Sequence, residues 1–313
     1  MDKELLAYYK LRDKLQRVSN GIATSDTEFP FVLNPTSANH HYIPKFFIDG
    51  FLNEKGLVWC YDKVNDRIKK NAQGPKGVFF EINRNSATID GTLFSIFEDA
   101  YKVYDDLFPV AIKILRREAI ESELFNELIH HFIIFLLDLY WRNPNTDKFI
   151  DNLFALLPAD SQPFKGIAPQ GITKQQLRLE IEPIILEAVS KVSEGQNYYT
   201  VAFPSNSICL GDMPMIFKQQ PSKTLDFGTQ PLIAPITSKK LFVRNVSNRQ
   251  FWDGPTILVL NAIIIHYSSR MIVCADKRIL EESIKTYHKA KNDDLLDYCL
   301  IRIFGNDLVN PSE

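Results

Sequence analysis

The sequence predicts an α+β protein in which a helical half packs on a mixed, mainly antiparallel sheet. From about residue 90 to 195, apolar residues recur at helical spacing, whereas about 196–275 holds short β-branched and aromatic runs broken by Pro, Gly and Ser. The 313 residues are 45% hydrophobic and 24% charged, which is typical of a globular protein and argues against disorder or a coiled coil.

We expect residues 1–38 to form an N-terminal helix and linker, and 39–313 to form one compact domain. Apolar residues at loose helical spacing predict a helix over 2–18, and the Ser-, Thr- and Pro-rich stretch 19–36 predicts a loop. Pro44 favours the start of a short helix. The runs at 57–61 and 78–82 are predicted to pair as a hairpin.

The middle of the chain predicts helices, and the third quarter predicts strands. The expected helices are 94–104, 108–118, 124–141 (ending at Asn143-Pro144) and 173–195. The expected strands are 198–203, 207–210, 215–218, 232–236 and 241–244. Asp253 and Asp276 are predicted to cap two further helices, separated by an apolar run at 271–275, and residues 295–304 follow them.

The N-terminus is charged throughout and has no apolar core, so it does not predict a signal peptide. The most apolar helical stretch, 132–137, is far shorter than a membrane span needs and predicts a buried core helix. The four cysteines have no paired zinc-ligand spacing. A cytoplasmic protein with reduced thiols and no membrane partner is therefore expected. The formal charge of −2 gives no support to a strongly basic nucleic-acid binder, although a local basic patch stays open.

The order of short motifs resembles the domain-of-unknown-function family 4238. The motifs that carry the resemblance are H-Y-I-P-K-F-F at 41–47, an aromatic strand ending in Asp at 59–62, Phe97-Glu98, Arg142-Asn143-Pro144, Asp212-Met213-Pro214 with Gly211 in place of the usual Ser, the less typical 234–238 segment and Asn261 on a late helix. The resemblance covers about residues 39–275. It implies one shared site and no particular reaction.

Four polar residues within these motifs are candidate catalytic residues. His41 titrates near neutrality and suits a general base or metal ligand, or alternatively a helix cap. Asp212 lies between two predicted strands and suits an acid, base or ligand, or alternatively an ordinary turn. Glu98 is either a catalytic carboxylate or a structural partner for Arg142, whose guanidinium is suited to holding an anion. Asp212 and Glu98 are the expected ligands of Mg²⁺ or Mn²⁺.

Other side chains are candidates for contacting a substrate. Two basic segments, Lys63 to Lys76 and Lys239 to Arg249, are able to track a phosphate backbone if they come together, although solvated loops are the commoner reason for such runs. The predicted substrate contacts are Lys45, Lys239, Lys240, Arg244 and Asn261. For Asn261, a hydrogen bond within the core is the default reading.

Two functions remain open at this point. If His41, Glu98, Arg142 and Asp212 converge, they suit hydrolysis of nucleic-acid phosphodiesters, as in a phage-defence or toxin effector. The alternative is a non-catalytic protein- or nucleic-acid-binding module, in which the H-Y-x-P and D-x-P motifs are structural turns. No dinucleotide, P-loop, zincin or α/β-hydrolase motif is present in the sequence.

Overall fold

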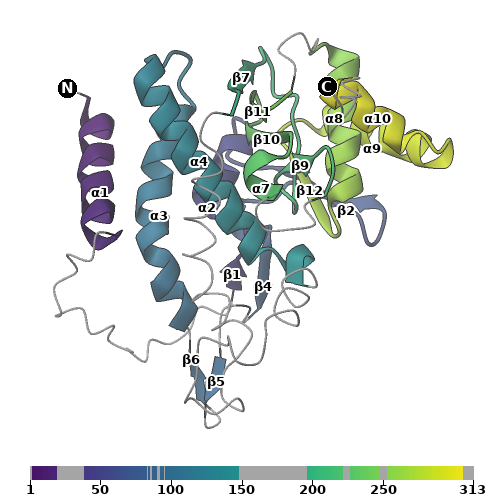
Figure 1. The fold of residues 1–313 in the computed structure, drawn as a ribbon. Helices are drawn as coiled ribbons and strands as arrows, with labels where there is room; N and C mark the ends of the chain where they lie inside the picture. The colour runs from purple at the N-terminus through teal and green to yellow at the C-terminus, as the bar shows by residue number, and fades with distance from the viewer. Residues whose placement is uncertain are drawn as a thin grey trace, which may run out of the picture. The chain divides into compact units, whose positions relative to one another are not determined.

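The computed structural model shows an α+β protein, as the sequence predicts, and every strand pair in the part described is antiparallel. The structure describes residues 2–19, 39–82, 84, 87–89, 92–94, 96–147, 196–220, 226–246 and 252–305. The loop predicted at 19–36 and the helix predicted at 173–195 lie essentially outside these residues. The chain divides into two compact units. Figure 1 labels the helices and strands that are described below.

Unit 1 comprises Met1–Tyr42 and Phe80–Leu186, and unit 2 comprises Ile43–Phe79 and Glu187–Glu313. Each unit is therefore built from two separate stretches of chain. The single domain expected from residue 39 onward stays a prediction.

The described residues of unit 1 form three long helices and two small strand pairs. The helices are α1 (Lys3–Ser19), α3 (Ile96–Leu115) and α4 (Ser122–Arg142), followed by the short η3 (Pro144–Thr146). The strands are β1 (Asn39–His41) paired with β4 (Phe80–Ile82), and β5 (Ala87–Ile89) paired with β6 (Thr92–Phe94).

The helix α4 forms the apolar centre of unit 1. From Leu128 to Arg142, every side chain is buried except those of the half-buried His130, His131 and Ile134, so the core helix predicted around 132–137 is confirmed. By length and composition alone α4 could also cross a membrane, but 61% of its most apolar stretch is buried inside the fold. A buried core helix passes the same test, so α4 is weak evidence for a membrane span.

Two four-stranded sheets are formed by the described residues of unit 2. The first has the order β3-β2-β12-β8, and the second has the order β7-β11-β10-β9. The strands are β2 (Trp59–Asp62), β3 (Arg67–Ile68), β7 (Tyr198–Ala202), β8 (Leu210–Gly211), β9 (Ile216–Phe217), β10 (Leu232–Thr237), β11 (Lys240–Arg244) and β12 (Met271–Cys274).

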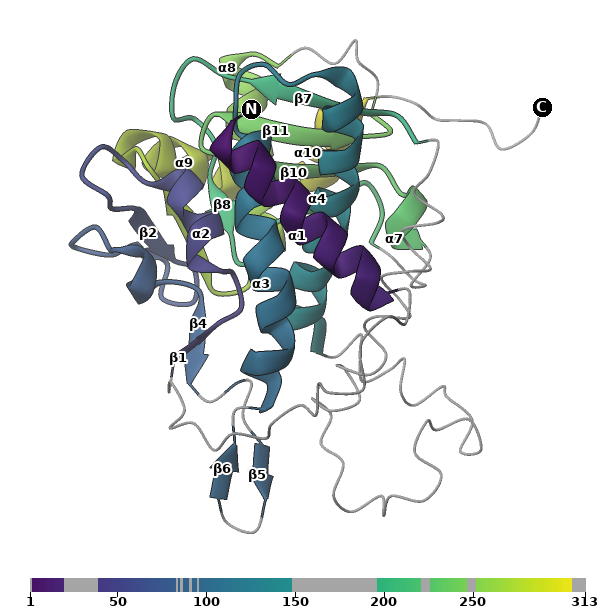
Figure 2. The same cartoon turned by 90° about the vertical axis from the view of Figure 1, so that its left-hand side faces the viewer.

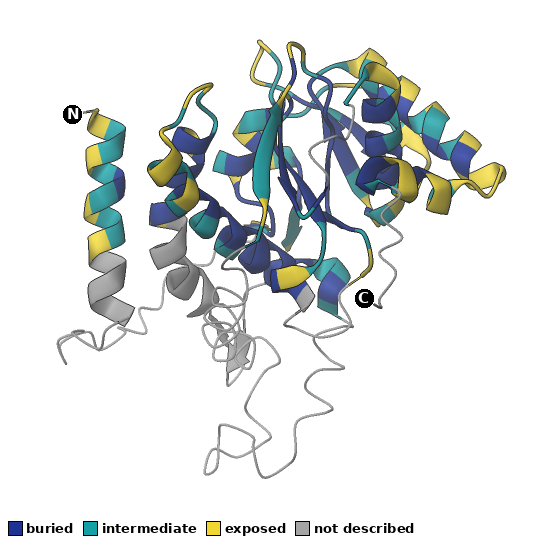
Figure 3. Cartoon of the chain, turned by 45° about the horizontal axis from the view of Figure 1, so that its top comes forward, coloured by how far each residue is buried: buried dark blue, intermediate teal, exposed yellow. Residues whose placement is uncertain are grey.

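The helices of unit 2 are one long buried helix and several shorter or amphipathic ones. They are α2 (Lys45–Ile48), α7 (Asp226–Thr229), α8 (Gly254–Tyr267), α9 (Lys277–Asn292) and α10 (Leu296–Phe304), with the short turns η1 (Asp49–Phe51) and η2 (Pro75–Gly77). Asp253 and Asp276 cap α8 and α9 as predicted, each accepting a hydrogen bond from backbone amides of the first turn. Most of the middle of α8 is buried (Figure 3), and it belongs to the same apolar cluster as residues of both sheets.

Two predictions about the elements were wrong. The strand at 78–82 does not pair with 57–61, because β4 pairs with β1 while β2 turns back at once into β3. His40 and His41 therefore lie on a strand.

The second error concerns Pro109. Separate helices were predicted over 94–104 and 108–118, but α3 is one continuous helix that joins these ranges and contains Pro109. The loss of one backbone hydrogen bond at the proline is offset by a continuous buried face, formed by Leu107, Phe108, Ala111, Ile112, Ile114 and Leu115.

Candidate functional site

The two histidines of the H-Y-I-P motif lie on β1 in unit 1. The register places His40 opposite Glu81 and His41 opposite Phe80 on β4. His40 is buried, whereas His41 is half-buried with its ring centroid 5.8 Å from that of Phe80. Directly opposite side chains on paired strands lie close together. The structure therefore places a histidine beside a carboxylate that the sequence analysis did not identify.

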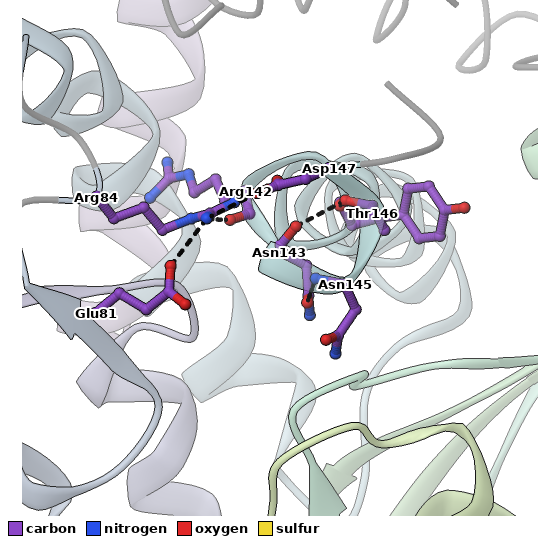
Figure 4. Close-up of polar contacts among 8 residues, drawn as sticks. Glu81, Arg84, Arg142, Asn143, Asn145, Thr146 and Asp147 are labelled. Carbon is purple, nitrogen blue, oxygen red and sulfur yellow. Dashed lines mark hydrogen bonds and ion pairs between the residues drawn. The ribbon is translucent and has the colours of Figure 1, made fainter. Parts of the chain in front are cut away.

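Arg84 connects β4 to the end of α4 (Figure 4). Its Nε donates to the main-chain oxygen of Arg142 over 2.8 Å, and its Nη1 donates to Glu81 Oε2 over 3.0 Å. Its Nη2 donates to Asp147 Oδ1 over 2.8 Å. The Arg84 side chain is only 10% exposed. Arg84 therefore joins the histidine strand to the Arg142-Asn143-Pro144 motif within unit 1, and three of its donors are engaged in doing so.

The Arg142 side chain forms a buried ion pair one helical turn back. Its Nε lies 2.7 Å from Asp138 Oδ1, and the two side chains are 5% and 0% exposed. A buried pair of this kind is stable only when both charges are present. Glu98, the partner considered from the sequence, lies in α3, but its side chain is outside the described residues. Its catalytic and metal-binding roles stay predictions.

The turn after Arg142 satisfies its own polar groups. The Asn143 side chain accepts a hydrogen bond from the Asn145 amide over 2.9 Å, and the Thr146 hydroxyl donates to the carbonyl oxygens of Tyr140 and Asn143 (Figure 4). These bonds satisfy carbonyl groups at the C-terminal end of α4 that would otherwise lack partners. The R-N-P motif therefore ends a core helix and starts the η3 turn.

Asp212 is buried in unit 2, where its carboxylate is surrounded by main-chain amides. It accepts hydrogen bonds from the amides of Ser269, Arg270 and Met271 over 2.9, 2.7 and 3.3 Å. These amides belong to the connection between α8 and β12. The D-x-P motif thus fixes the start of β12 against β8, with which it pairs.

The same connection explains why position 211 is a glycine. A Cβ atom on Gly211 would lie 2.0 Å from Ser268 Oγ, so only glycine fits at this position without displacing its neighbours.

Lys63, which directly follows the Trp59–Asp62 strand, contacts the chain next to this connection. Its ammonium group donates to the carbonyl oxygens of His266 and Ser268, over 2.9 and 2.5 Å, at the C-terminal end of α8. A cation is favourable at that end of a helix. Burial lowers the pKa of Lys63, while the charge of Asp212 acts in the opposite direction. Lys63 therefore stabilises the end of α8, next to the connection that Asp212 binds.

Asn261 is fully buried in α8, and its amide is satisfied within the core. Its Oδ1 accepts from the Cys209 amide over 3.0 Å, and its Nδ2 donates to the Ser207 carbonyl over 2.8 Å and to Ser283 Oγ over 3.1 Å. The default reading from the sequence thus describes the contacts found, and a substrate contact by Asn261 stays a prediction.

The predicted basic contacts differ in their exposure. Lys45 and Lys239 are exposed, whereas Lys240 and Arg244 are buried in β11. Burial lowers the pKa of Lys240 and lowers that of Arg244 to about 10. The Arg244 guanidinium donates to the carbonyl oxygens of Phe227 and Gln230, which places it inside the fold. Arg249 lies outside the described residues.

The structure instead brings the first basic segment next to α9. Asp66 in the β2–β3 turn lies 3.0 Å from His288 Nε2, and Lys277 Nζ lies 5.3 Å from the centre of the Trp59 ring. Lys63 Nζ is 5.3 Å from the Tyr287 ring. We call residues 63–70 together with α9 the hairpin–helix surface. The cations of these two segments are Lys63, Arg67, Lys69, Lys70, Lys277, Arg278, Lys285, Lys289 and Lys291.

The four predicted catalytic residues are divided between the units. His41, Glu98 and Arg142 belong to unit 1, and Asp212 belongs to unit 2. Within the described ranges, no group of three or more His, Cys, Asp or Glu side chains is placed to hold a metal ion. The convergence of the four residues and the Mg²⁺ or Mn²⁺ site stay predictions.

A comparison of the sequence with family models identifies the family of the chain. The family model described as "Protein of unknown function (DUF4238)" matches residues 39–277, and the chain belongs to this family. This match confirms the resemblance derived from the motifs. No curated protein and no solved structure matches the chain.

Proposed function

We propose that the protein is a non-catalytic nucleic-acid-binding module whose family motifs hold the fold together. The observation that carries this proposal is the environment of Asp212, the residue best suited from the sequence to be an acid, base or metal ligand. Three main-chain amides already donate to its buried carboxylate. A carboxylate held in this way is stabilised as a structural anion.

The hairpin–helix surface is the proposed contact with nucleic acid. Lys and Arg outnumber Asp and Glu in unit 2, while the reverse holds in unit 1. Two of the cations, Lys277 and Lys285, pair with Glu281 and Glu282. The exposed cations Lys70, Lys289 and Lys291 form no ion pair with another described residue. Phosphates attract such cations, and the resulting binding weakens with salt.

The test is a fluorescence-anisotropy titration of the full chain with labelled single-stranded RNA, single-stranded DNA and duplex DNA at several salt concentrations. We expect binding that weakens as salt rises. The double variants Lys69→Glu with Lys70→Glu and Lys289→Glu with Lys291→Glu should each weaken it at least tenfold, which is about 1.4 kcal/mol.

The matched control is Lys45→Glu with Lys239→Glu, two exposed lysines outside the hairpin–helix surface. This variant should bind as the unaltered chain does. Loss of binding in this control alone would move the interface to Lys45 and Lys239, and no binding by the unaltered chain at low salt would refute the proposal.

A second candidate function is hydrolysis of nucleic-acid phosphodiesters, with a phage-defence or toxin role as its setting and the cytoplasm as its compartment. It is favoured by the half-buried His41, which neighbours the His40–Glu81 pair on β1 and β4. The test is incubation of labelled DNA and RNA with Mg²⁺ or Mn²⁺. Cleavage that disappears in His41→Ala and Glu98→Gln, with unchanged melting temperatures, would establish the hydrolase and replace the first proposal.

A further inference from the structure

The N-terminal helix α1 is attached to unit 1 by one regularly spaced row of side chains. Glu4, Tyr8 and Arg12 occur at intervals of four residues, which places them on one face of the helix. This face covers α3 and α4 (Figures 1 and 2).

Each residue of the row meets a complementary partner. Glu4 contacts Lys113 and Arg117 of the α3 end over 2.5 and 2.6 Å. The Tyr8 hydroxyl lies 3.0 Å from Glu127 and 2.9 Å from His131 Nδ1 on α4. Arg12 forms an ion pair with Glu127 over 2.9 Å. We call the surface formed by Lys113, Arg117, Glu127 and His131 the α1-docking face.

These contacts hold α1 only weakly. Most are ion pairs between partly exposed groups, such as Lys113 at 67% exposure, and pairs of this kind contribute about 0–1 kcal/mol each. Tyr8 is the one α1 side chain among the described residues that is fully buried. A helix attached in this way is released far more easily than α4, which is buried along most of its length.

The family model leaves out α1 but includes the helices that α1 contacts. The family model begins at residue 39, after α1, and includes both α3 and α4. The α1-docking face is therefore part of the shared family region, and α1 is not.

We propose that the α1-docking face is an exchangeable helix-binding site, and that α1 of a second copy of this chain occupies it to form a reciprocal dimer. The contacts of α1 within the chain identify this occupant, since α1 itself carries the complementary acidic, aromatic and basic row. In the unaltered chain the tethered α1 has an effective concentration in the millimolar range, so the exchanged dimer is a minor species at micromolar protein. This inference is independent of nucleic-acid binding.

A charge-reversal pair makes the exchange visible. Arg12→Glu and Glu127→Arg each place like charges opposite one another, both within the chain and between identical copies. When the two variants are mixed, Glu at position 12 of one chain meets Arg at position 127 of the other, and the reciprocal contact restores the original pair. We expect each variant alone to sediment as a monomer in analytical ultracentrifugation and the mixture to form a heterodimer.

The matched control carries both reversals in one chain. It restores the pair within the chain and should remain monomeric, alone or mixed with the unaltered chain. A mixture of the single variants that stays monomeric, with both variants folded by circular dichroism, would overturn the proposal.

A second measurement covers the case in which a variant fails to fold. A labelled peptide of residues 2–19 is titrated into the full unaltered chain and into the Glu4→Arg variant, whose own α1 is repelled by Lys113 and Arg117. We expect the peptide to bind the variant at least tenfold more tightly, because the site is freed. Equal affinity for both chains would refute the exchange.

Discussion

The end of α4 in unit 1 and the Gly211–Asp212 turn in unit 2 both bury charged family-motif residues, but they satisfy those charges differently. At the end of α4, the guanidinium of Arg142 meets the carboxylate of Asp138. In the turn, the carboxylate of Asp212 meets main-chain amides of residues 269–271. The comparison shows that a charged motif residue is no evidence for catalysis until its partners are known.

The difference has an energetic consequence. An ion pair depends on two side chains, and removing either one leaves a buried charge without its partner. A carboxylate bound by amides depends on one side chain, and removing it leaves neutral donors. We therefore expect substitutions at the end of α4 to cost more than those in the turn.

The largest effect is expected for Asp138→Ala. It leaves the buried Arg142 guanidinium without its carboxylate and should lower the free energy of unfolding by about 3–5 kcal/mol. The measurement is urea denaturation followed by circular dichroism. The control is the double variant Asp138→Leu with Arg142→Met, which removes both charges and should recover most of the loss. If the double variant is no more stable than Asp138→Ala, the unpaired Arg142 charge is not the cause of the loss of stability.

Asp212→Ala is expected to cost less, about 1–3 kcal/mol, because the amides of residues 269–271 lose their acceptor but carry no charge. Asp212→Asn should cost less than Asp212→Ala, since the amide oxygen of asparagine accepts some of these bonds. Both variants are measured in the same urea titration. A loss greater than that of Asp138→Ala would reverse the comparison.

Gly211→Ala tests the packing of the same turn without touching a charge. The added Cβ would lie 2.0 Å from Ser268 Oγ, which we expect to cost about 1–3 kcal/mol. Adding Ser268→Gly removes the hydroxyl group and should restore part of the stability in a thermal melt. No recovery would mean that the added Cβ destabilises the fold through its contact with Ile264, whose Cγ2 would lie 3.0 Å away.

Local signals explain how much of the fold was predictable. Asp253, Asp276 and the Asn143-Pro144 pair mark helix ends through their own backbone preferences, and the structure confirms these ends. The pairing of β4 with β1 was missed because strand pairing joins residues far apart in the sequence.

The same distinction applies to the candidate site. Arg84 lies three residues after Glu81, but it meets Asp147 only through the fold, so no local pattern identified this set of contacts. Asp138 had a usable signal: a lone acidic residue on an apolar helix, four residues before Arg142, predicts an ion pair at helical spacing.

The smallest expected effect concerns His131, a titratable group that has neither a dedicated carboxylate nor a set of amides. Tyr8 and Arg12 face it from α1, and Glu127 and His130 lie near it on α4. Burial lowers the pKa of His131 below 6.5, so the unfolded chain binds a proton at a higher pH than the folded chain does. Stability is therefore complete above about pH 6.5 and falls as the pH drops below it. We expect a loss of at most about 1 kcal/mol between pH 7.5 and 5.5, measured by urea denaturation at each pH. His131→Gln should show a shallower decline than the unaltered chain, because the remaining pH dependence then comes from the other titratable groups, among them His266, whose pKa burial also lowers. An identical slope in both chains would show that His131 does not titrate differently in the folded state.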